Sequence, residues 1–196
     1  MSKIKKSSEL LQQASKDTHE IITTFKSDLK PLAEAQLVWK SAPEKWSILQ
    51  CLEHLNLTNR HYIPEMKMAI QKAIATGQSP AEDFKRGFIG RKMTTGIKPK
   101  IDGTIPNRTR TFKNYNPNNL PPSESTQAVF DEFLQHHEDF LMIIEDSKKV
   151  NMNKVKVKSL LGSILKFKLG DAIEFVIAHE QRHILQAKNI SVSYTH

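Results

Sequence analysis

The chain has 196 residues, of which 38% are hydrophobic and 26% charged, and it carries a formal net charge of +8. This length and balance predict a single globular domain over residues 1–196, with enough chain to bury a core. No stretch approaches the ~20 apolar residues that a membrane helix needs, so no membrane partner is expected. One cysteine, Cys51, excludes an internal disulfide. Together with an N-terminus that lacks a secretory pattern, it predicts a cytoplasmic protein.

The first predicted helix follows from apolar residues that recur at helical spacing between Ile4 and Leu29. Ser7 or Ser8 is expected to cap its start, and Pro31 lies just beyond its end.

The second predicted helix begins within the segment KWSILQCLEHL. Ser47 and Gln50 have the spacing of a capping box, and Gly77 is a natural stop. Pro64 falls inside the pattern, which predicts a kink or a break there. The apolar face of this helix consists of Ile48, Leu52, Leu55, Tyr62, Met66 and Ile70.

Residues 77–122 form a long connection that is rich in proline, glycine and basic residues. It holds six of the nine prolines, five of the seven glycines, and nine basic residues against three acidic ones. A connection of this length is unusual in a compact domain, so it is either functional or wraps around the helices. Its charge fits a solvated loop, which we favour, or a rim that attracts anions. No DNA-binding motif accompanies it, so a nucleic-acid partner is not expected.

Two further helices are predicted, at about residues 123–147 and from about Gly170 to Asn189. The segment KVKVKSLLGSILKFKLG between them begins with strict alternation, which indicates a short strand. The pattern as a whole predicts an all-α fold, a four-helix bundle with a long irregular crossover connection between helices 2 and 3.

The last predicted helix contains the sequence HEQRH, in which His179 and His183 are four residues apart. This spacing puts both imidazoles on one face of the helix, within reach of one ion. The same stripe carries Ala172, Val176, Ala187 and Ile190, so the pair is expected to face the interior. Two buried imidazoles need partners. Either they share a metal ion, or each bonds a neighbouring carboxylate or carbonyl.

Read literally, HEQRH is the zinc-peptidase pattern H-E-x-x-H with Glu180 as general base. A peptidase needs a third ligand, and no Asp or Glu follows Glu180, while His196 is the terminal residue and a poor ligand. The peptidase interpretation is therefore disfavoured. His54 on the second helix is the best upstream candidate, since antiparallel packing would bring it to His179 and His183. Three nitrogen ligands with an open position are typical of catalytic zinc.

The remaining candidates are weaker. His61 lies seven residues after His54 on the same helix face, where it would support the site or line its mouth. His136 and His137 are adjacent and point in different directions, so both cannot join one cluster. Cys51 could reach the same place as a thiolate, although a small buried hydrophobe is the preferred interpretation.

Three segments resemble one family, the DinB/YfiT-like superfamily and its DinB-2 branch. EKWSILQCLEHL resembles the W-S-x6-H-L opening of the family's second helix, and IAHEQRHILQAKNI resembles the H-E-x-R-H-x-x-Q pattern of its last helix. FKRGFIGRKM, followed by a proline-rich basic stretch, is similar to the middle of the DinB-2 branch. The resemblance implies a four-helix bundle, often dimeric, that holds zinc or nickel through His54, His179 and His183.

The resemblance also implies a class of activity. The family includes proteins described as metal-dependent hydrolases and thiol S-transferases that use bacillithiol, mycothiol or glutathione. We therefore expect an enzyme acting on a small molecule through a metal that activates a bound water or thiol. Glu180 is a weak candidate base, because its offset of about 100° from His179 favours a structural role. Arg182 is a weak candidate for the substrate rim, where it would receive an anionic group.

Two other functions remain open from the sequence. One is a non-catalytic binding or stress-response protein that the metal stabilises. The other is a metal-free helical interaction module whose histidines are satisfied internally.

Overall fold

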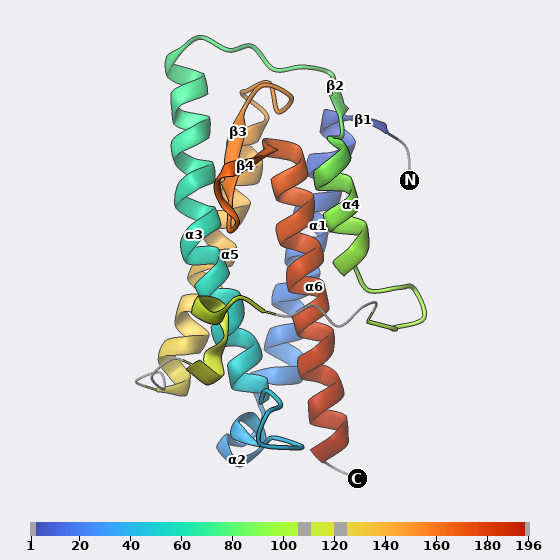
Figure 1. Ribbon diagram of the computed structural model, residues 1–196, viewed down its shortest axis with the longest axis vertical. Coiled ribbons are helices and arrows are strands. Elements are labelled where there is room, and N and C mark those ends of the chain that lie inside the picture. The colour runs from blue at the N-terminus through green and yellow to red at the C-terminus, as the bar shows by residue number, and fades with distance from the viewer. Residues whose placement is uncertain (1–2, 106–110, 120–124, 195–196) are drawn as a thin grey trace.

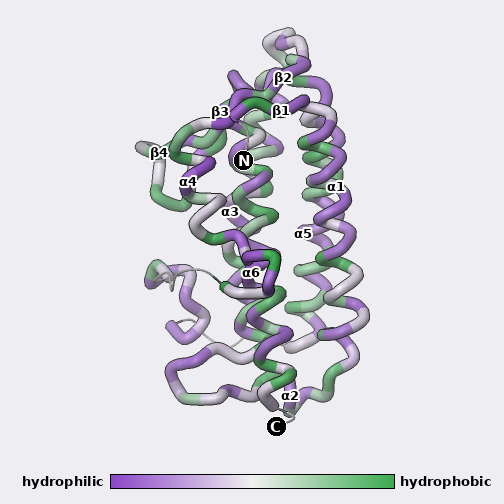
Figure 2. Tube along the Cα trace, turned by 90° about the vertical axis from the view of Figure 1, so that its right-hand side faces the viewer, coloured by the Kyte–Doolittle hydropathy of each residue, from purple (hydrophilic) through white to green (hydrophobic). Residues whose placement is uncertain are grey.

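The computed structural model describes residues 3–105, 111–119 and 125–194, and within these ranges the chain is predominantly helical, as predicted. Its long helices lie side by side, with α3 packed on α5 and α6, and α1 packed on the same two helices (Figure 1). Apolar and polar residues interleave along each of them (Figure 2), as expected for helices that bury one face. The four long helices are α1 (Ser7–Thr24), α3 (Ile48–Ala75), α5 (Thr126–Ser147) and α6 (Leu169–Tyr194). Within the described residues, no helix is both long enough and apolar enough to cross a membrane.

The core divides into two apolar clusters at different heights along α3 and α6. One contains Tyr62 and Phe175, and the other contains Leu55 and Ile184. The α6 segment between these clusters carries His179 and His183, whereas His54 lies between Leu52 and Leu55 on α3, among the residues of the second cluster.

The start of α3 forms as the sequence predicts. Ser47 Oγ accepts a hydrogen bond from the backbone N–H of Gln50 at 3.1 Å, and Gln50 Oε1 accepts from the N–H of Ser47 at 3.3 Å. The helix runs unbroken through Pro64, so the break considered from the sequence does not occur. Pro64 is exposed, so the carbonyl that loses its helical partner lies on the solvent side, where water can bond it. Gly77 follows the helix with a φ of 69°.

The start of the first helix differs from the prediction. Ile4–Lys6 forms strand β1, which pairs antiparallel with β2 (Asp83–Lys85). Ser7 is the first residue of α1, and its hydroxyl donates to the carbonyl of Ala81 rather than capping the helix. The cap prediction was wrong because a distant segment pairs with this end of the chain, which local spacing does not reveal. After α1, a π-helical turn, η1 (Phe25–Leu29), continues the helix, and a short helix, α2 (Glu34–Val38), follows.

The connection after α3 is not irregular throughout, contrary to expectation. It contains β2, the helix α4 (Phe88–Ile97) and the 3-10 turns η2 (Lys113–Tyr115) and η3 (Pro117–Asn119). The helix α4 packs on α6. Gly90 and Gly96 give α4 a low intrinsic helix propensity, so its pattern was not recognised. Within its described residues, the connection therefore adds a layer against α6.

The alternating segment before α6 forms a hairpin of β3 (Lys156–Ser159) and β4 (Gly162–Lys168). Val157 and Phe167 face inward, while the lysines between them stay exposed. The predicted strand is thus present with a partner. Ser125 caps α5, which begins at Thr126, three residues after the start expected near residue 123, and α6 extends beyond Asn189 to Tyr194.

Candidate metal site

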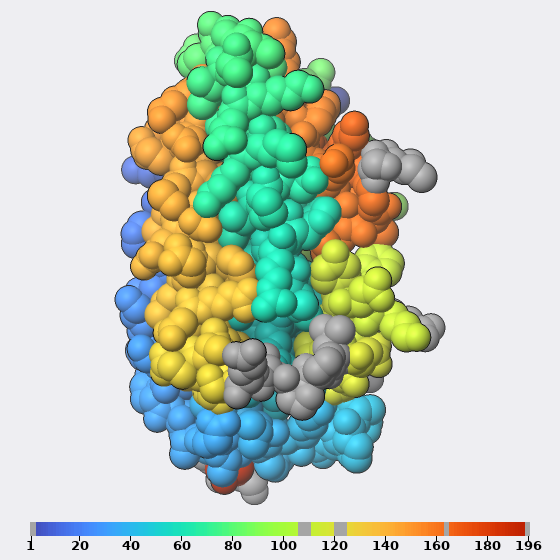
Figure 3. All heavy atoms as spheres, turned by 90° about the vertical axis from the view of Figure 1, so that its left-hand side faces the viewer, coloured from blue at the N-terminus to red at the C-terminus, as the bar shows by residue number. Residues whose placement is uncertain are grey.

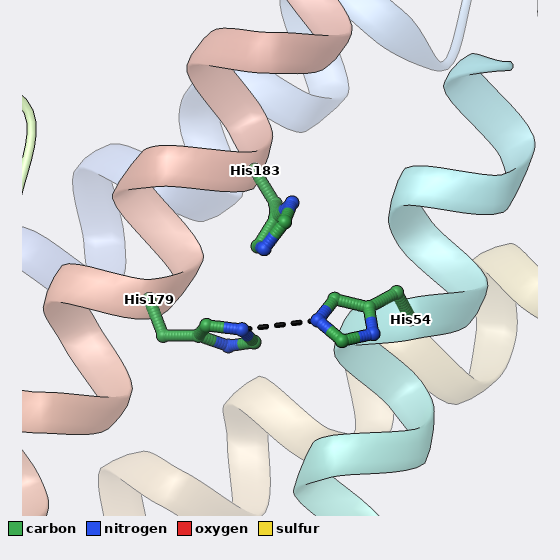
Figure 4. Close-up of side chains that lie close together, drawn as sticks. All are labelled: His54, His179 and His183. Atoms are coloured by element: carbon green, nitrogen blue, oxygen red, sulfur yellow. Dashed lines mark hydrogen bonds between the residues drawn. The ribbon is translucent and has the colours of Figure 1, made fainter. Parts of the chain in front are cut away.

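Three histidines from two helices meet between the apolar clusters. One ring nitrogen from each of His54, His179 and His183 lies within 4.8 Å of the other two. His54 comes from α3, and the other two come from successive turns of α6, with the rings pointing toward one another (Figure 4). The Nε2 atoms of His54 and His179 are 3.0 Å apart. The structure thus brings together the three residues that the sequence singled out.

Hydrogen bonds to the far side of two rings fix which nitrogen faces the centre. His54 Nδ1 lies 2.7 Å from the backbone oxygen of Tyr115, which can only accept, so Nδ1 carries the proton. His183 Nδ1 lies 3.1 Å from Gln186 Oε1 and donates in the same way. Both rings therefore present an unprotonated Nε2 to the centre, the arrangement by which outer partners orient histidine ligands of metals.

The electrostatics of the three histidines favour the neutral form that binds metals. Burial lowers the pKa of His54 to about 4. Burial also holds the pKa values of His179 and His183 well below the ordinary value, and the positive charge of Arg182 adds to the effect. All three rings are neutral at pH 7, so a cation need not displace a proton from them.

The spacing also fits a cation. Two imidazole nitrogens bound to one tetrahedral zinc ion at 2.0–2.1 Å lie roughly 3.3 Å apart, close to the observed separation of His54 and His179. A hydrogen bond between these nitrogens would require one of them to carry a proton, whereas a cation lets both offer a lone pair. The residues present therefore fit a divalent metal ion.

The model of one protein family matches most of the chain. It is described as the DinB superfamily, and it matches residues 18–187. The chain belongs to the DinB superfamily. Comparison with curated proteins and with solved structures gives no match.

An aromatic ring covers two of the histidines of this DinB-superfamily chain. The ring of Trp46 lies 4.9 Å from that of His54 and stacks on that of His183 at 5.7 Å, between centroids. Trp46 Nε1 donates to Asn116 Oδ1 at 3.1 Å. Since Tyr115 and Asn116 both belong to the long connection, that segment helps to build the site.

The carboxylate of Glu180 is bound on the side away from the histidine cluster. Asn59 Nδ2 donates to Oε1 at 2.8 Å, and His137 Nε2 donates to Oε2 at 2.6 Å. Glu180 and His137 are both buried. This placement favours the structural role over the role of a base, and it removes the group that a peptidase of the H-E-x-x-H type would use. Sequence reasoning had noted only that His137 diverges from His136.

The other candidate residues do not join the histidine cluster. His61 Nε2 donates to the carbonyl of Lys158 at 3.1 Å, in contact with the β3–β4 hairpin rather than with the cluster. Arg182 is buried and lines the cavity described below. Cys51 is fully buried in an apolar cluster, and burial raises the pKa of its thiol, so it behaves as a small hydrophobe.

The histidine cluster opens into a cavity of about 1020 Å³. The walls are formed by α3, α4, α6, the β3–β4 hairpin and residues 105–119 of the connection, as far as they are described. Figure 3 shows the hairpin and residues 111–119 beside α3, on the side opposite α5. A cavity of this size accepts a ligand considerably larger than water.

Proposed function

We propose that this protein is a metal-dependent enzyme of the thiol S-transferase or hydrolase type that acts on a small molecule. The observation that carries the proposal is the convergence of three neutral imidazoles on the wall of a cavity of about 1020 Å³. A structural zinc site normally fills all four positions with protein ligands. Among the described residues, the cluster offers three, and the fourth direction is open to a ligand.

The metal proposed is zinc or nickel, held in the family's four-helix bundle by His54, His179 and His183. Bound there, it would supply the Lewis acidity that lowers the pKa of a coordinated thiol or water toward neutral pH. The protein's own residues hold the ligand nitrogens in an orientation that points them toward the centre of the cluster. Tyr115 and Gln186 orient two of the rings, and the ring of Trp46 packs against those of His54 and His183.

The positive charge of Arg182 supports an anionic substrate or thiol cosubstrate, such as bacillithiol, mycothiol or glutathione. Arg182 lies close enough to the cluster to lower the pKa values of His179 and His183. A cytoplasmic location with reducing conditions fits the single buried cysteine. A homodimer is part of the same proposal, and sedimentation analysis at several concentrations tests it.

One observation favours a second function, that of a metal-stabilised binding protein. The cluster joins α3 to α6, so a bound ion would link two long helices whether or not any reaction follows. This alternative predicts the same metal content without turnover.

The first test is metal analysis of protein purified without a histidine tag. We expect about one divalent ion per chain, and its loss when His54, His179 and His183 are changed to Ala. His19→Ala is the matched control, because His19 is exposed on α1 and lies outside the cluster. Metal-free wild-type protein that takes up no added zinc or nickel would refute the site.

The second test is a turnover screen with zinc-, nickel- and manganese-loaded protein. Bacillithiol, mycothiol, glutathione and cysteine are each combined with a chlorodinitrobenzene electrophile, and activated esters are tested for hydrolysis. Turnover that the triple histidine variant loses and His19→Ala keeps supports the enzyme. Stoichiometric metal with no turnover on any pair favours the binding protein.

A further inference from the structure

The cavity next to the histidine cluster has an apolar end and a polar end. Along α3, Tyr62 lies two turns beyond His54, whereas Trp46 precedes the helix. Along antiparallel α6, Phe175 lies one turn before His179, and Gln186 lies one turn after His183. The histidines therefore sit between Tyr62 and Phe175 at one end and Trp46 and Gln186, which carry hydrogen-bonding groups, at the other.

Apolar side chains from three helices, the hairpin and the connection line the end beyond His179. The ring of Phe175 stacks on that of His179 with 6.1 Å between centroids, and the ring of Tyr62 lies 5.9 Å from that of Phe175. The hydroxyl of Tyr62 accepts from the backbone N–H of Leu160, so it faces the hairpin. The remaining apolar lining comes from α4, the hairpin and the connection: Met93, Ile97, Ile105, Leu160 and Leu161.

Apolar residues continue from this end to the mouth of the cavity. Leu161, in the turn of the hairpin, and Phe112, in the connection, both line the cavity, although their exposed fractions are 47% and 52%. Exposed apolar residues that rim a cavity are typical of a site for a ligand with apolar surface.

Positive charge predominates at the other end. Arg182 is only 8% exposed and lines the cavity, and Lys45 and Lys113 are exposed at its edge. Glu44 is the acidic residue among the described residues that line the cavity. Two of these cations are exposed lysines, whereas Arg182 is buried, and its planar guanidinium suits an anionic group.

We infer that the cavity binds a single-chain amphiphile, with an anionic head between the histidines and Arg182 and an alkyl body along Tyr62, Phe175, Leu161 and α4. The inference rests on the proposed function for its polar end, since the proposed metal lies there. It assigns the substrate class: a small molecule with a linear apolar chain rather than a compact polar metabolite. The apolar end exists independently of any metal, so the two can be tested separately.

The test is a titration with butyl, hexyl, octyl and decyl sulfonate below their micellar concentrations. Sulfonates keep their charge and bind metals weakly, so they report on the cavity rather than on the ion. Trp46 lines the cavity, and its fluorescence reports binding once Trp39, the other tryptophan, is changed to Phe. Calorimetry on the same samples checks the affinities. Both metal-free and zinc-loaded protein are used, and metal content is measured in each.

The expected result is an affinity that rises roughly fourfold per added methylene until the apolar end is full. Leu161→Asp and Ile97→Asp each reduce this dependence on chain length, because they place a charge along the alkyl body. Ile89→Asp is the matched control for Ile97→Asp, since Ile89 is exposed on the same helix and does not line the cavity. Arg182→Gln weakens all four sulfonates by a similar factor.

Two results would overturn the inference: an affinity that does not change with chain length, or an equal effect of Ile89→Asp and Ile97→Asp. A stoichiometric metal ion without chain-length dependence removes this inference and leaves the proposed function standing. Chain-length dependence in a protein that binds no metal supports this inference and removes the proposed function. Leu161 is in an exposed turn, so its variant keeps the test decisive if Ile97→Asp fails to fold.

Discussion

His137 and Glu180 form a buried ion pair one residue away from the histidine cluster. His137 Nδ1 lies 2.7 Å from the carbonyl oxygen of Phe133, and Nε2 lies 2.6 Å from Glu180 Oε2. Both partners accept, so both ring nitrogens carry protons, and the contact with Glu180 raises the pKa of His137 although burial opposes it. The pair joins α5 to α6 at the residue that follows His179 in the chain.

We predict that breaking this pair destabilises the protein strongly. His137→Ala or Glu180→Ala leaves a buried charge without its partner, which typically costs about 3–5 kcal/mol in the free energy of unfolding. Urea denaturation measures this loss. Glu132→Ala is the control, because Glu132 pairs with the exposed Arg60 and its loss should cost less than about 1 kcal/mol. Equal losses in the buried and exposed variants would contradict the assignment of an ion pair.

The sequence predicted the histidine cluster well because helix periodicity determines which residues share a face. His179 and His183 needed only the helical repeat of α6, and His54 needed only antiparallel packing of α3 on α6. The partners of these histidines could not be predicted in the same way. Tyr115 and Asn116 lie in the connection, whose path depends on tertiary packing rather than on a local pattern. The pairing of His137 with Glu180 was not predicted, because neither residue carries a sequence signal for a partner 43 residues away.

The prediction of an irregular connection was wrong for a related reason. The long helices have strong apolar periodicity, whereas α4 is short and contains two glycines. One of them, Gly90, lies so close to α6 that a Cβ atom there would meet Asp171 Cβ at 2.5 Å. A residue that is unfavourable for an isolated helix is required here by the close approach of two helices. Local propensity and tertiary packing thus point in opposite directions at this position.

Gly170 makes a second close approach, which gives a prediction on stability. A Cβ at this position would lie 2.7 Å from Cζ of Phe84, and Phe84 is fully buried. Gly170→Ala should therefore lower the free energy of unfolding by about 1–3 kcal/mol through overpacking. Gly96→Ala is the matched control, since a Cβ there meets nothing within 4 Å and alanine favours the helix, so stability should stay equal or rise by up to about 1 kcal/mol. Thermal unfolding of both variants decides the point, and a stable Gly170→Ala protein would show that β2 can shift.

The metal-free protein should lose stability as the pH falls from about 6.5 to about 4. Burial lowers the pKa of His54 to about 4 from its ordinary value of 6.5, so between these values the unfolded chain binds a proton that the folded chain does not. The free energy of unfolding therefore falls with falling pH, by up to roughly 3 kcal/mol from this residue. Denaturation at pH 7 and pH 4.5 measures the difference, and His54→Gln should reduce it. If both proteins respond equally to pH, His54 does not have the lowered pKa.

The support that Gln186 gives to His183 predicts an effect on metal affinity without loss of a ligand. Gln186 Oε1 accepts from His183 Nδ1, which holds the ring with Nε2 toward the centre. Gln186→Leu keeps the packing volume but removes the acceptor, so zinc affinity should fall about 10- to 100-fold. Competition with a chromogenic chelator measures the affinity. Gln181→Leu is the control, because Gln181 lies on the same helix but lines a different small cavity.

A second readout comes from unfolding, since zinc at about 100 times its dissociation constant should raise the free energy of unfolding of the wild type by about 2.7 kcal/mol. At the same zinc concentration, Gln186→Leu should gain much less. Equal zinc affinity in the two leucine variants would mean that His183 is oriented by its packing against Trp46 alone.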